Sequence, residues 1–176
     1  MSELRVIKYG NPLLRFRAKK IEHIDETIRQ LAADMIETMQ KEAGIGLAAP
    51  QVAQSIRLIV IDWSLIDEKE KPIALINPEI LEGEGESVLE EGCLSLPEIR
   101  EDVSRPEIVK ISYQELNGEL VEKRLDGLFA RVFQHELDHL NGILLIDRIS
   151  SLKKKMLTKK LKQLAAEERE IMSKVA

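Results

Sequence analysis

Cysteine is nearly absent from this 176-residue chain, in which Cys93 is the single example. One cysteine cannot form an internal disulfide, so the composition fits a reducing compartment. Long apolar runs are also missing: none approaches the length that spans a bilayer, and Met1–Arg5 does not begin an apolar signal region. The net charge of -5 argues against nucleic-acid binding by the surface as a whole. We therefore expect a cytoplasmic protein whose partners include neither a membrane nor DNA.

What the chain does contain is the composition of one ordinary globular domain. Apolar residues make up 44% and charged residues 32% of it, and its length is sufficient to bury a core. No internal repeat and no linker divides the sequence. We expect a single domain over residues 1–176, with a core at about 1–149 and a C-terminal helix at about 150–174.

The most informative pattern is the segment Gln134–Leu140. In a helix, His135 and His139 lie one turn apart on the same face, where two imidazoles can hold one metal ion. Glu136 projects beside them and can reach water at that metal. The chain has three histidines, and two of them stand in this H-E-x-x-H pattern, which is typical of metal-dependent hydrolases. Histidines that are merely buried and hydrogen-bonded are the alternative interpretation.

Two other segments contain candidates for the same site. A catalytic metal of this type usually has three protein ligands, and since no third histidine lies near His139, Cys93 or a carboxylate is left for that role. A cysteine buried in the core is the alternative. The segment Gly44–Gln51 is uncharged, and its two glycines would let the backbone lie against a ligand or, equally, pack as a tight turn. Gln51 is its one side-chain donor.

Apolar periodicity predicts an α+β fold. We expect antiparallel sheets packed around a central metal-binding helix that ends at Asn141-Gly142, and a long charged helix from Ser150. Another helix should follow Asp25 and end near Gly44. Strands are expected at Leu4–Ile7, Arg57–Asp62, Ile73–Ile76, Glu107–Tyr113, Glu119–Lys123 and Ile143–Leu145, and the turn Gly83–Gly85 should separate Ile80–Glu82 from Ser87–Glu90.

Three segments together, Gly44–Gln51, Glu91–Ser95 and Gln134–His139, resemble the three signature motifs of the peptide deformylases. They occur in that family's order and at similar separations, and the resemblance extends from Leu4 to about Arg148. It implies that the single domain is catalytic and removes the N-formyl group from the initiator methionine of new polypeptides, which releases formate. Formyl-methionyl nascent peptides are then the substrates. The implied location is the bacterial cytoplasm, or an organelle after removal of a transit peptide.

The resemblance also implies a role for each site residue. One divalent metal ion is bound, with ferrous iron as the native ion and nickel, cobalt or zinc as other occupants. Water on that metal is the nucleophile. Glu136 acts first as the general base that accepts the water's proton and later as the general acid that delivers it to the leaving amine. The backbone N–H of Leu94 and the side-chain amide of Gln51 stabilise the oxyanion. The implied metal ligands are Cys93, His135 and His139.

Substrate binding should resemble the addition of a strand. The extended peptide is expected to pair with backbone at Ile45 and Gly46 on one side and at Gly92 on the other. An apolar pocket would accept the methionine side chain. Its expected walls, each of which could also be plain core, are Leu89, Leu128 and Val132.

Two other functions remain open at this point. An H-E-x-x-H endopeptidase with a different third ligand would cleave internal peptide bonds. A non-catalytic, metal-stabilised module would bind the ribosome through the lysine-rich segment Lys153–Lys162. That segment is either the solvated face of an amphipathic helix or a contact to RNA phosphates, and the resemblance favours the contact for bacterial members.

Overall fold

The computed structural model describes residues 3–175 and has an α+β fold, as expected from the sequence. One antiparallel sheet has five strands in the order β1-β2-β3-β6-β7, and β4 and β5 form a second, two-stranded sheet. The elements in chain order are η1 (Pro12–Arg15), α1 (Glu26–Lys41), β1 (Gly46–Ala48), η2 (Ala49–Val52), β2 (Leu58–Asp62), η3 (Trp63–Leu65), β3 (Pro72–Glu84), β4 (Ser87–Cys93), β5 (Leu96–Arg105), β6 (Ile108–Gln114), β7 (Leu120–Leu125), α2 (Gly127–Leu140), η4 (Leu145–Asp147), α3 (Ser151–Met156) and α4 (Thr158–Val175).

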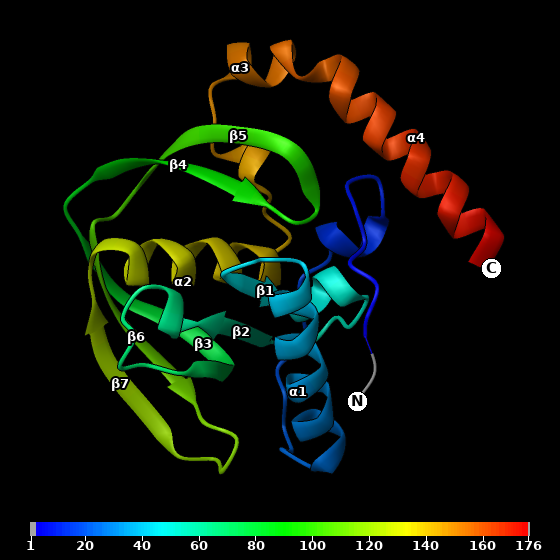
Figure 1. The fold of residues 1–176 in the computed structure, drawn as a ribbon. Coiled ribbons are helices and arrows are strands. Elements are labelled where there is room, and N and C mark those ends of the chain that lie inside the picture. Colours follow the sequence, from blue (N-terminus) through cyan, green and yellow to red (C-terminus); the bar gives the residue numbers. More distant parts are fainter. Residues whose placement is uncertain (1–2, 176) are drawn as a thin grey trace.

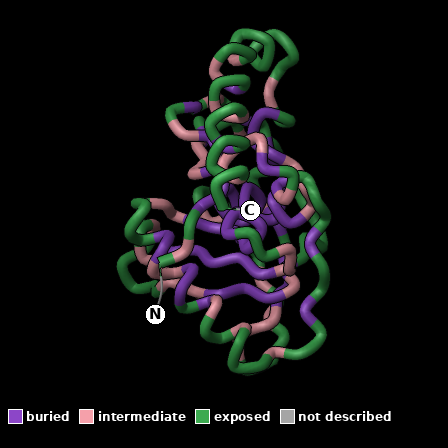
Figure 2. The backbone as a smooth tube through the Cα atoms, turned by 90° about the vertical axis from the view of Figure 1, so that its right-hand side faces the viewer, coloured by how far each residue is buried: buried purple, intermediate pink, exposed green. Residues whose placement is uncertain are grey.

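The five-stranded sheet is covered by a helix on each face. In Figure 1, α2 lies between this sheet and the β4–β5 pair, and α1 packs on the sheet's other side. Strand β2 shows why: every residue in it is buried, and successive side chains point to opposite faces. Ile59 and Ile61 join the core under α2, whereas Leu58 and Val60 join the core under α1. Figure 2 shows these buried segments gathered in the middle of the molecule.

Helix α2 is buried far more completely than a surface helix. Every residue from Ala130 to Leu140 is buried, although this stretch includes histidines and acidic residues. Buried charged groups need partners, so the polar side chains of α2 must face one another or other polar groups. The helix therefore carries the candidate site into the interior of the protein.

The C-terminal segment forms two helices where the sequence predicted one. Helix α3 ends at Met156, and the Thr158 hydroxyl donates a hydrogen bond to the carbonyl of Lys155 at 2.7 Å. A hydroxyl that donates to a helix carbonyl in this way interrupts the regular series of backbone hydrogen bonds, so α4 starts as a separate helix. Figure 1 shows α4 running beside the N-terminal segment and ending as a projecting arm. No helix within residues 3–175 combines the length and apolar character needed to cross a membrane.

Two strand predictions were wrong. Residues 4–7 form no strand, because Ile7 donates its backbone N–H to Gln51 while Tyr9 donates to Ser95, so no ladder with one partner develops. Residues 143 and 144 precede η4, and residue 145 is its first residue. There Asp147 accepts a hydrogen bond from the backbone N–H of Leu144 at 2.8 Å.

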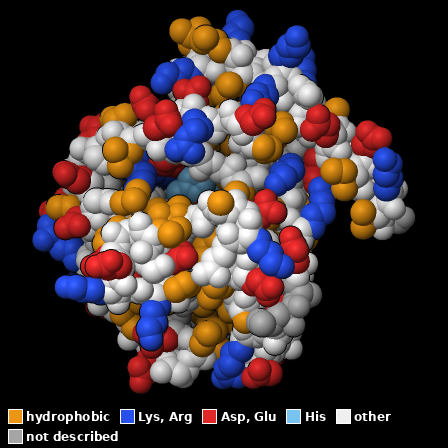
Figure 3. Space-filling model, viewed as in Figure 1, with side chains coloured by type: hydrophobic (Ala, Val, Ile, Leu, Met, Phe, Trp, Pro, Cys, Tyr) orange, Lys and Arg blue, Asp and Glu red, His pale blue; other side chains and the backbone are white. Residues whose placement is uncertain are grey.

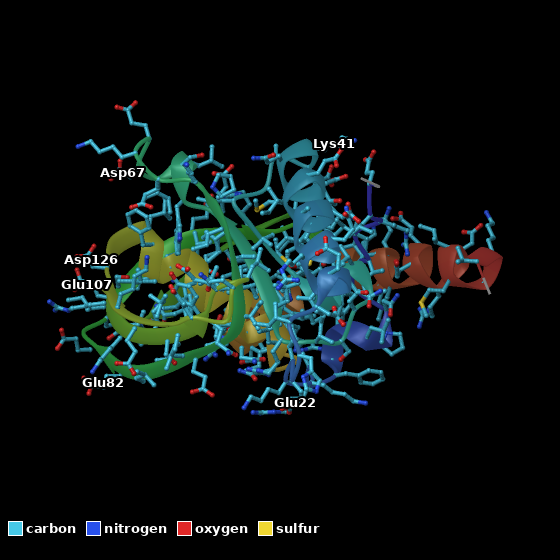
Figure 4. All side chains as sticks on the ribbon, turned by 90° about the horizontal axis from the view of Figure 1, so that it is seen from below. Glu22, Lys41, Asp67, Glu82, Glu107 and Asp126 are labelled. Atoms are coloured by element: carbon cyan, nitrogen blue, oxygen red, sulfur yellow. The ribbon has the colours of Figure 1, made fainter. Side chains whose placement is uncertain are left out.

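The remaining differences concern where strands begin and end. The run predicted to end at Ile76 continues as β3 to Glu84, with Asn77 at a positive φ of 50° and a register shift beside it. Strand β5 was not predicted at all. The hairpins β2–β3 and β6–β7 are present as expected, and the charged loop between β2 and β3 projects into solvent, as the labelled Asp67 shows in Figure 4.

Candidate metal centre

Three candidate ligands meet where the end of β4 faces the middle of α2. Cys93 is the last residue of β4, and His135 and His139 stand one turn apart on α2. One ligand atom from each lies within 4.8 Å of the other two, and Cys93 Sγ is 3.3 Å from His139 Nε2. Figure 3 shows a histidine surface at the bottom of a hollow. The fold thus brings together the residues that the sequence suggested as metal ligands.

The chemistry of this donor set fits one divalent metal ion. Thiolate and imidazole are ligands that zinc and ferrous iron accept, and three protein ligands leave a coordination position open. His135 Nδ1 lies 2.8 Å from Glu91 Oε1, which orients the ring and leaves Nε2 for the metal. Burial by itself raises the pKa of the Cys93 thiol, but the charge of His139 and hydrogen bonds with both histidines bring that pKa well below its usual value. The thiolate is the form that binds a metal.

Glu136 stands beside these ligands as a buried carboxyl group. It is 4% exposed, and within residues 3–175 its Oε2 atom has no hydrogen-bond partner. Gly46 makes room for it, because a Cβ atom at that position would lie 2.7 Å from Glu136 Oε1. Burial raises the pKa of Glu136 even though His135 and His139 act in the opposite direction. A carboxyl group with a raised pKa is suited to accept and return a proton near neutral pH.

Gln51 lies on η2 with its amide fixed at both ends. The backbone N–H of Ala48 donates to Gln51 Oε1 at 2.9 Å, which leaves the amide nitrogen facing the site. That nitrogen donates to Ser95 Oγ at 3.1 Å and lies 3.6 Å from Cys93 Sγ. Leu94, between those two residues, packs its side chain against Gly44. A side-chain donor therefore points to the place where Cys93 and the ligand histidines meet.

A buried network of ion pairs supports the ligand His135. Glu91 accepts hydrogen bonds from Arg105 at 2.6 and 2.9 Å and from Arg131 at 2.7 Å. Arg105 also donates to Asp138 on α2 at 2.8 Å. Although burial opposes it, the hydrogen bonds of Arg105 and His135 hold the pKa of Glu91 far below its usual value. Glu91 is thus a carboxylate that holds a metal-ligating ring in one orientation.

Reasoning from the sequence missed this network. Glu91 stands inside one of the three motifs, directly before Gly92 and Cys93, and Arg131 is a charge in an otherwise apolar stretch of the helix. Since buried charges are almost always paired, a lone arginine on the core face of a helix is a usable signal for a buried carboxylate partner. The signal does not say which carboxylate, because Glu91 lies on β4 and reaches Arg131 of α2 only through the packing of the two elements.

All but one of the candidate substrate residues line one cavity of about 480 Å³. Leu89 is not among the residues that line it: this side chain is 43% exposed on β4, opposite Val103. The cavity is also lined by Lys8 and Glu42, which the sequence did not suggest as site residues. The expected residues that do line the cavity are Ile45, Gly46, Gly92, Leu128 and Val132.

Comparisons with known proteins agree on one family. A family model described as polypeptide deformylase matches residues 3–155. A curated peptide deformylase of Thermotoga maritima is 50% identical over 162 residues, which cover 92% of this chain and 96% of that protein. The crystal structure of a Synechococcus elongatus peptide deformylase in complex with actinonin is 46% identical with a TM-score of 0.84, and covers 89% of this chain and 87% of that chain. The crystal structure of peptide deformylase 1B of Arabidopsis thaliana in complex with an inhibitor is 36% identical with a TM-score of 0.90, and the match covers 97% of this chain and 94% of that chain.

These matches decide between the functions that the sequence left open. Cys93 lies where it could serve as the third ligand beside the two histidines, which does not match an endopeptidase with some other third ligand. The family model covers most of the chain, including all three motifs. This chain therefore belongs to the peptide deformylase family and is a metal-dependent hydrolase.

Proposed function

We propose that this chain hydrolyses the formyl group of N-terminal formylmethionine on newly made polypeptides, using the side chains around the cavity beside α2. The observation that carries the proposal is the meeting of Cys93, His135 and His139 beside a cavity that is lined by Cys93, His135 and Glu136. A divalent ion held by the thiolate and the two imidazoles would polarise the formyl oxygen and make hydroxide accessible near neutral pH.

Glu136 moves the proton in this scheme. Its carboxylate takes a proton from the attacking water and later delivers it to the methionine nitrogen as the carbon–nitrogen bond breaks. Formate and a free α-amine leave, so one water is consumed for each formyl group. The unpartnered Oε2 atom and the raised pKa of Glu136 support this role, because the group must both accept and return the proton.

The amide of Gln51 and the backbone N–H of Leu94 stabilise the oxyanion that forms on the formyl oxygen. The support is the fixed orientation of Gln51, whose Oε1 is held by Ala48 so that Nε2 faces the site. Donors that are already in place cost no reorganisation when the charge develops. Each such donor is typically worth about 3 kcal/mol of barrier.

The peptide binds as an added strand between two short edges of backbone. Ile45 and Gly46 line one side of the cavity and Gly92 the other, and main-chain pairing tolerates many downstream residues. The methionine side chain enters the apolar part of the cavity beside Leu128 and Val132. Leu89, which was expected as a wall of the methionine pocket, lies outside that cavity and is not part of this proposal.

We propose ferrous iron as the native metal, with nickel, cobalt or zinc as ions that the same donors accept. The mixture of one thiolate and two imidazoles supports this choice without excluding zinc on chemical grounds. We also propose a cytoplasmic location and one catalytic domain over residues 1–176, in which about 1–149 form the core and about 150–174 form the helical C-terminal part.

The lysine-rich segment Lys153–Lys162 is proposed to contact the ribosome. Three of its lysines pair with acids on the body of the protein, such as Lys153 with Glu101 and Lys160 with Glu98. Among the residues that the structure describes, the others form no ion pair, and they are exposed and available to RNA phosphates. The lysines without an ion pair are Lys155, Lys159 and Lys162.

Formate release from formyl-Met-Ala-Ser by anaerobically purified protein tests this function, together with its metal content. The variant Glu136→Ala should retain the metal and lose turnover, whereas Glu167→Gln, an exposed carboxyl on α4, should change neither. Unchanged function of Glu136→Ala would favour the non-catalytic ribosome-binding module. Cleavage of an unformylated protein would return the endopeptidase to consideration.

A further inference from the structure

Helix α4 is fixed against the N-terminal segment and forms a wall beside it. The side chain of Glu168 is fully buried and forms an ion pair with Arg5, and the backbone N–H of Lys8 donates to Glu168 Oε2 at 3.3 Å. Gly10 packs so closely on the helix that an added Cβ would lie 2.6 Å from the Cα atom of Ala165. A helix held by a buried charge and by such close contact is part of the body of the protein along this stretch.

A second cavity, of about 510 Å³, lies between the N-terminal segment and α4. Arg5 and Val6 line it from one side and Ile171 of α4 from the other. Two further lining residues, Lys8 and Glu42, also line the rim of the active-site cavity. The two cavities therefore meet at these two charged residues, and in Figure 3 basic side chains lie between the histidine hollow and the α4 arm.

The direction of a bound peptide follows from the lining of the first cavity. The formyl end must lie at Cys93 and Glu136, and the apolar part of the cavity beside Val132 receives the methionine side chain. Lys8 and Glu42 line both cavities, so the rest of the peptide can leave the first cavity past these two residues. The ammonium group of Lys8 is already placed along that path, where it donates to the carbonyl of Leu94 at 3.0 Å.

We propose that the second cavity is a distal subsite for residues downstream of the formylmethionine, and that Ile171 contacts an apolar side chain there. This inference rests on the proposed deformylation. Ile171 is 39% exposed and lines the cavity together with the half-buried Leu4, so an apolar side chain there can contact both residues. An extended peptide advances about 3.3 Å per residue, so a peptide of about eight residues extends much further from the first cavity toward α4 than a tripeptide does.

Length-dependent kinetics on the full-length, metal-loaded enzyme test this subsite. We expect kcat/KM for a formylated peptide of about eight residues with downstream leucines to exceed that for formyl-Met-Ala-Ser about fivefold, through KM. Ile171→Glu should abolish this advantage, and replacing the downstream leucines by lysines should restore it in that variant. The matched control is Val175→Glu, at a residue 77% exposed on the same helix that lines neither cavity, and it should keep the wild-type ratio.

Four results would overturn the inference. Equal kcat/KM for both peptide lengths in the wild type would remove the distal subsite while leaving the proposed function intact. A loss in Ile171→Glu that is equal for short and long peptides, with no rescue by lysines, would mean that Ile171 acts only through stability. Self-association that Ile171→Glu abolishes would mean that a second copy fills the cavity. Absence of formate from formyl-Met-Ala-Ser would instead refute the proposed function, and the inference with it.

Discussion

Replacing Glu91 with glutamine should weaken both the fold and the metal site. Glu91 accepts from His135 at 2.8 Å, from Arg105 at 2.6 and 2.9 Å and from Arg131 at 2.7 Å, and it is 6% exposed. Breaking one partner of a buried ion pair typically costs about 3–5 kcal/mol. Arg105 keeps its bond to Asp138 and Arg131 keeps its bond to a carbonyl, so we expect the lower end, about 3 kcal/mol. Loss of the partner that orients His135 should lower metal affinity roughly 10–100-fold.

Urea unfolding and chelator competition measure the two effects of Glu91→Gln separately. Unfolding of the metal-free protein reports the ion-pair network alone, and competition reports the metal site. Glu90→Gln is the matched control, because Glu90 is the neighbouring residue and pairs with Arg100 at 2.8 Å while 59% exposed. An exposed pair of this kind contributes about 0–1 kcal/mol. If Glu91→Gln were no more destabilising than Glu90→Gln and bound metal equally well, the reasoning would be refuted.

The same variant should change how stability depends on pH. The folded-state pKa of Glu91 lies below its usual value of 4.5, so its contribution is fully present above that pH and is lost as the pH falls through lower values. Glu91→Gln lacks this titration. The difference in unfolding free energy between wild type and variant should therefore shrink between about pH 5 and pH 3. A constant difference over that range would contradict the assigned pKa direction.

Three other substitutions have defined outcomes. Gly46→Ala places a Cβ 2.7 Å from Glu136 Oε1, so the carboxyl group must move. This displacement should lower kcat roughly 10–100-fold in the formate assay. An unchanged kcat would show that the carboxyl position is not critical. Gly10→Ala combines a φ of 104° with a Cβ 2.6 Å from Ala165 Cα. Calorimetry should show that the free energy of unfolding falls by about 2 kcal/mol. An unchanged free energy of unfolding would mean that α4 is not held as described. Cys93→Ser should release the metal to a chelator at neutral pH, because a hydroxyl is a poor ligand, and retention of one ion per chain would argue against a thiolate ligand.

The candidate site could be predicted because its chemistry is concentrated in short segments. The spacing of His135 and His139 fixes their geometry as soon as the segment is a helix, with no knowledge of the rest of the fold. Cys93 needed the resemblance, since nothing local says that the end of β4 faces α2. Arg105 and Glu91 were missed because their contact depends on how β4, β5 and α2 pack together, which is a long-range property.

For the fold, too, the elements with local sequence signals were predicted, and those that depend on long-range contacts were not. The apolar run Leu58–Ile61 indicated a buried strand, and Asn117-Gly118 indicated the β6–β7 hairpin. Strand β5 gave no such signal, because two of its inward positions hold the charged residues Glu101 and Arg105. In addition, Glu98 has a positive φ of 64° and puts the buried Leu96 out of phase with Ile99 and Val103. An irregular strand of this kind is defined by its partner more than by its own sequence.

X-ray absorption spectroscopy of the metal-loaded protein tests the central claim most directly. The account predicts one sulfur at about 2.3 Å and two imidazole nitrogens at about 2.1 Å from the metal. In Cys93→Ser, any metal that remains should show no sulfur. A wild-type spectrum with only nitrogen and oxygen neighbours would contradict the assignment of Cys93, His135 and His139 as the metal ligands.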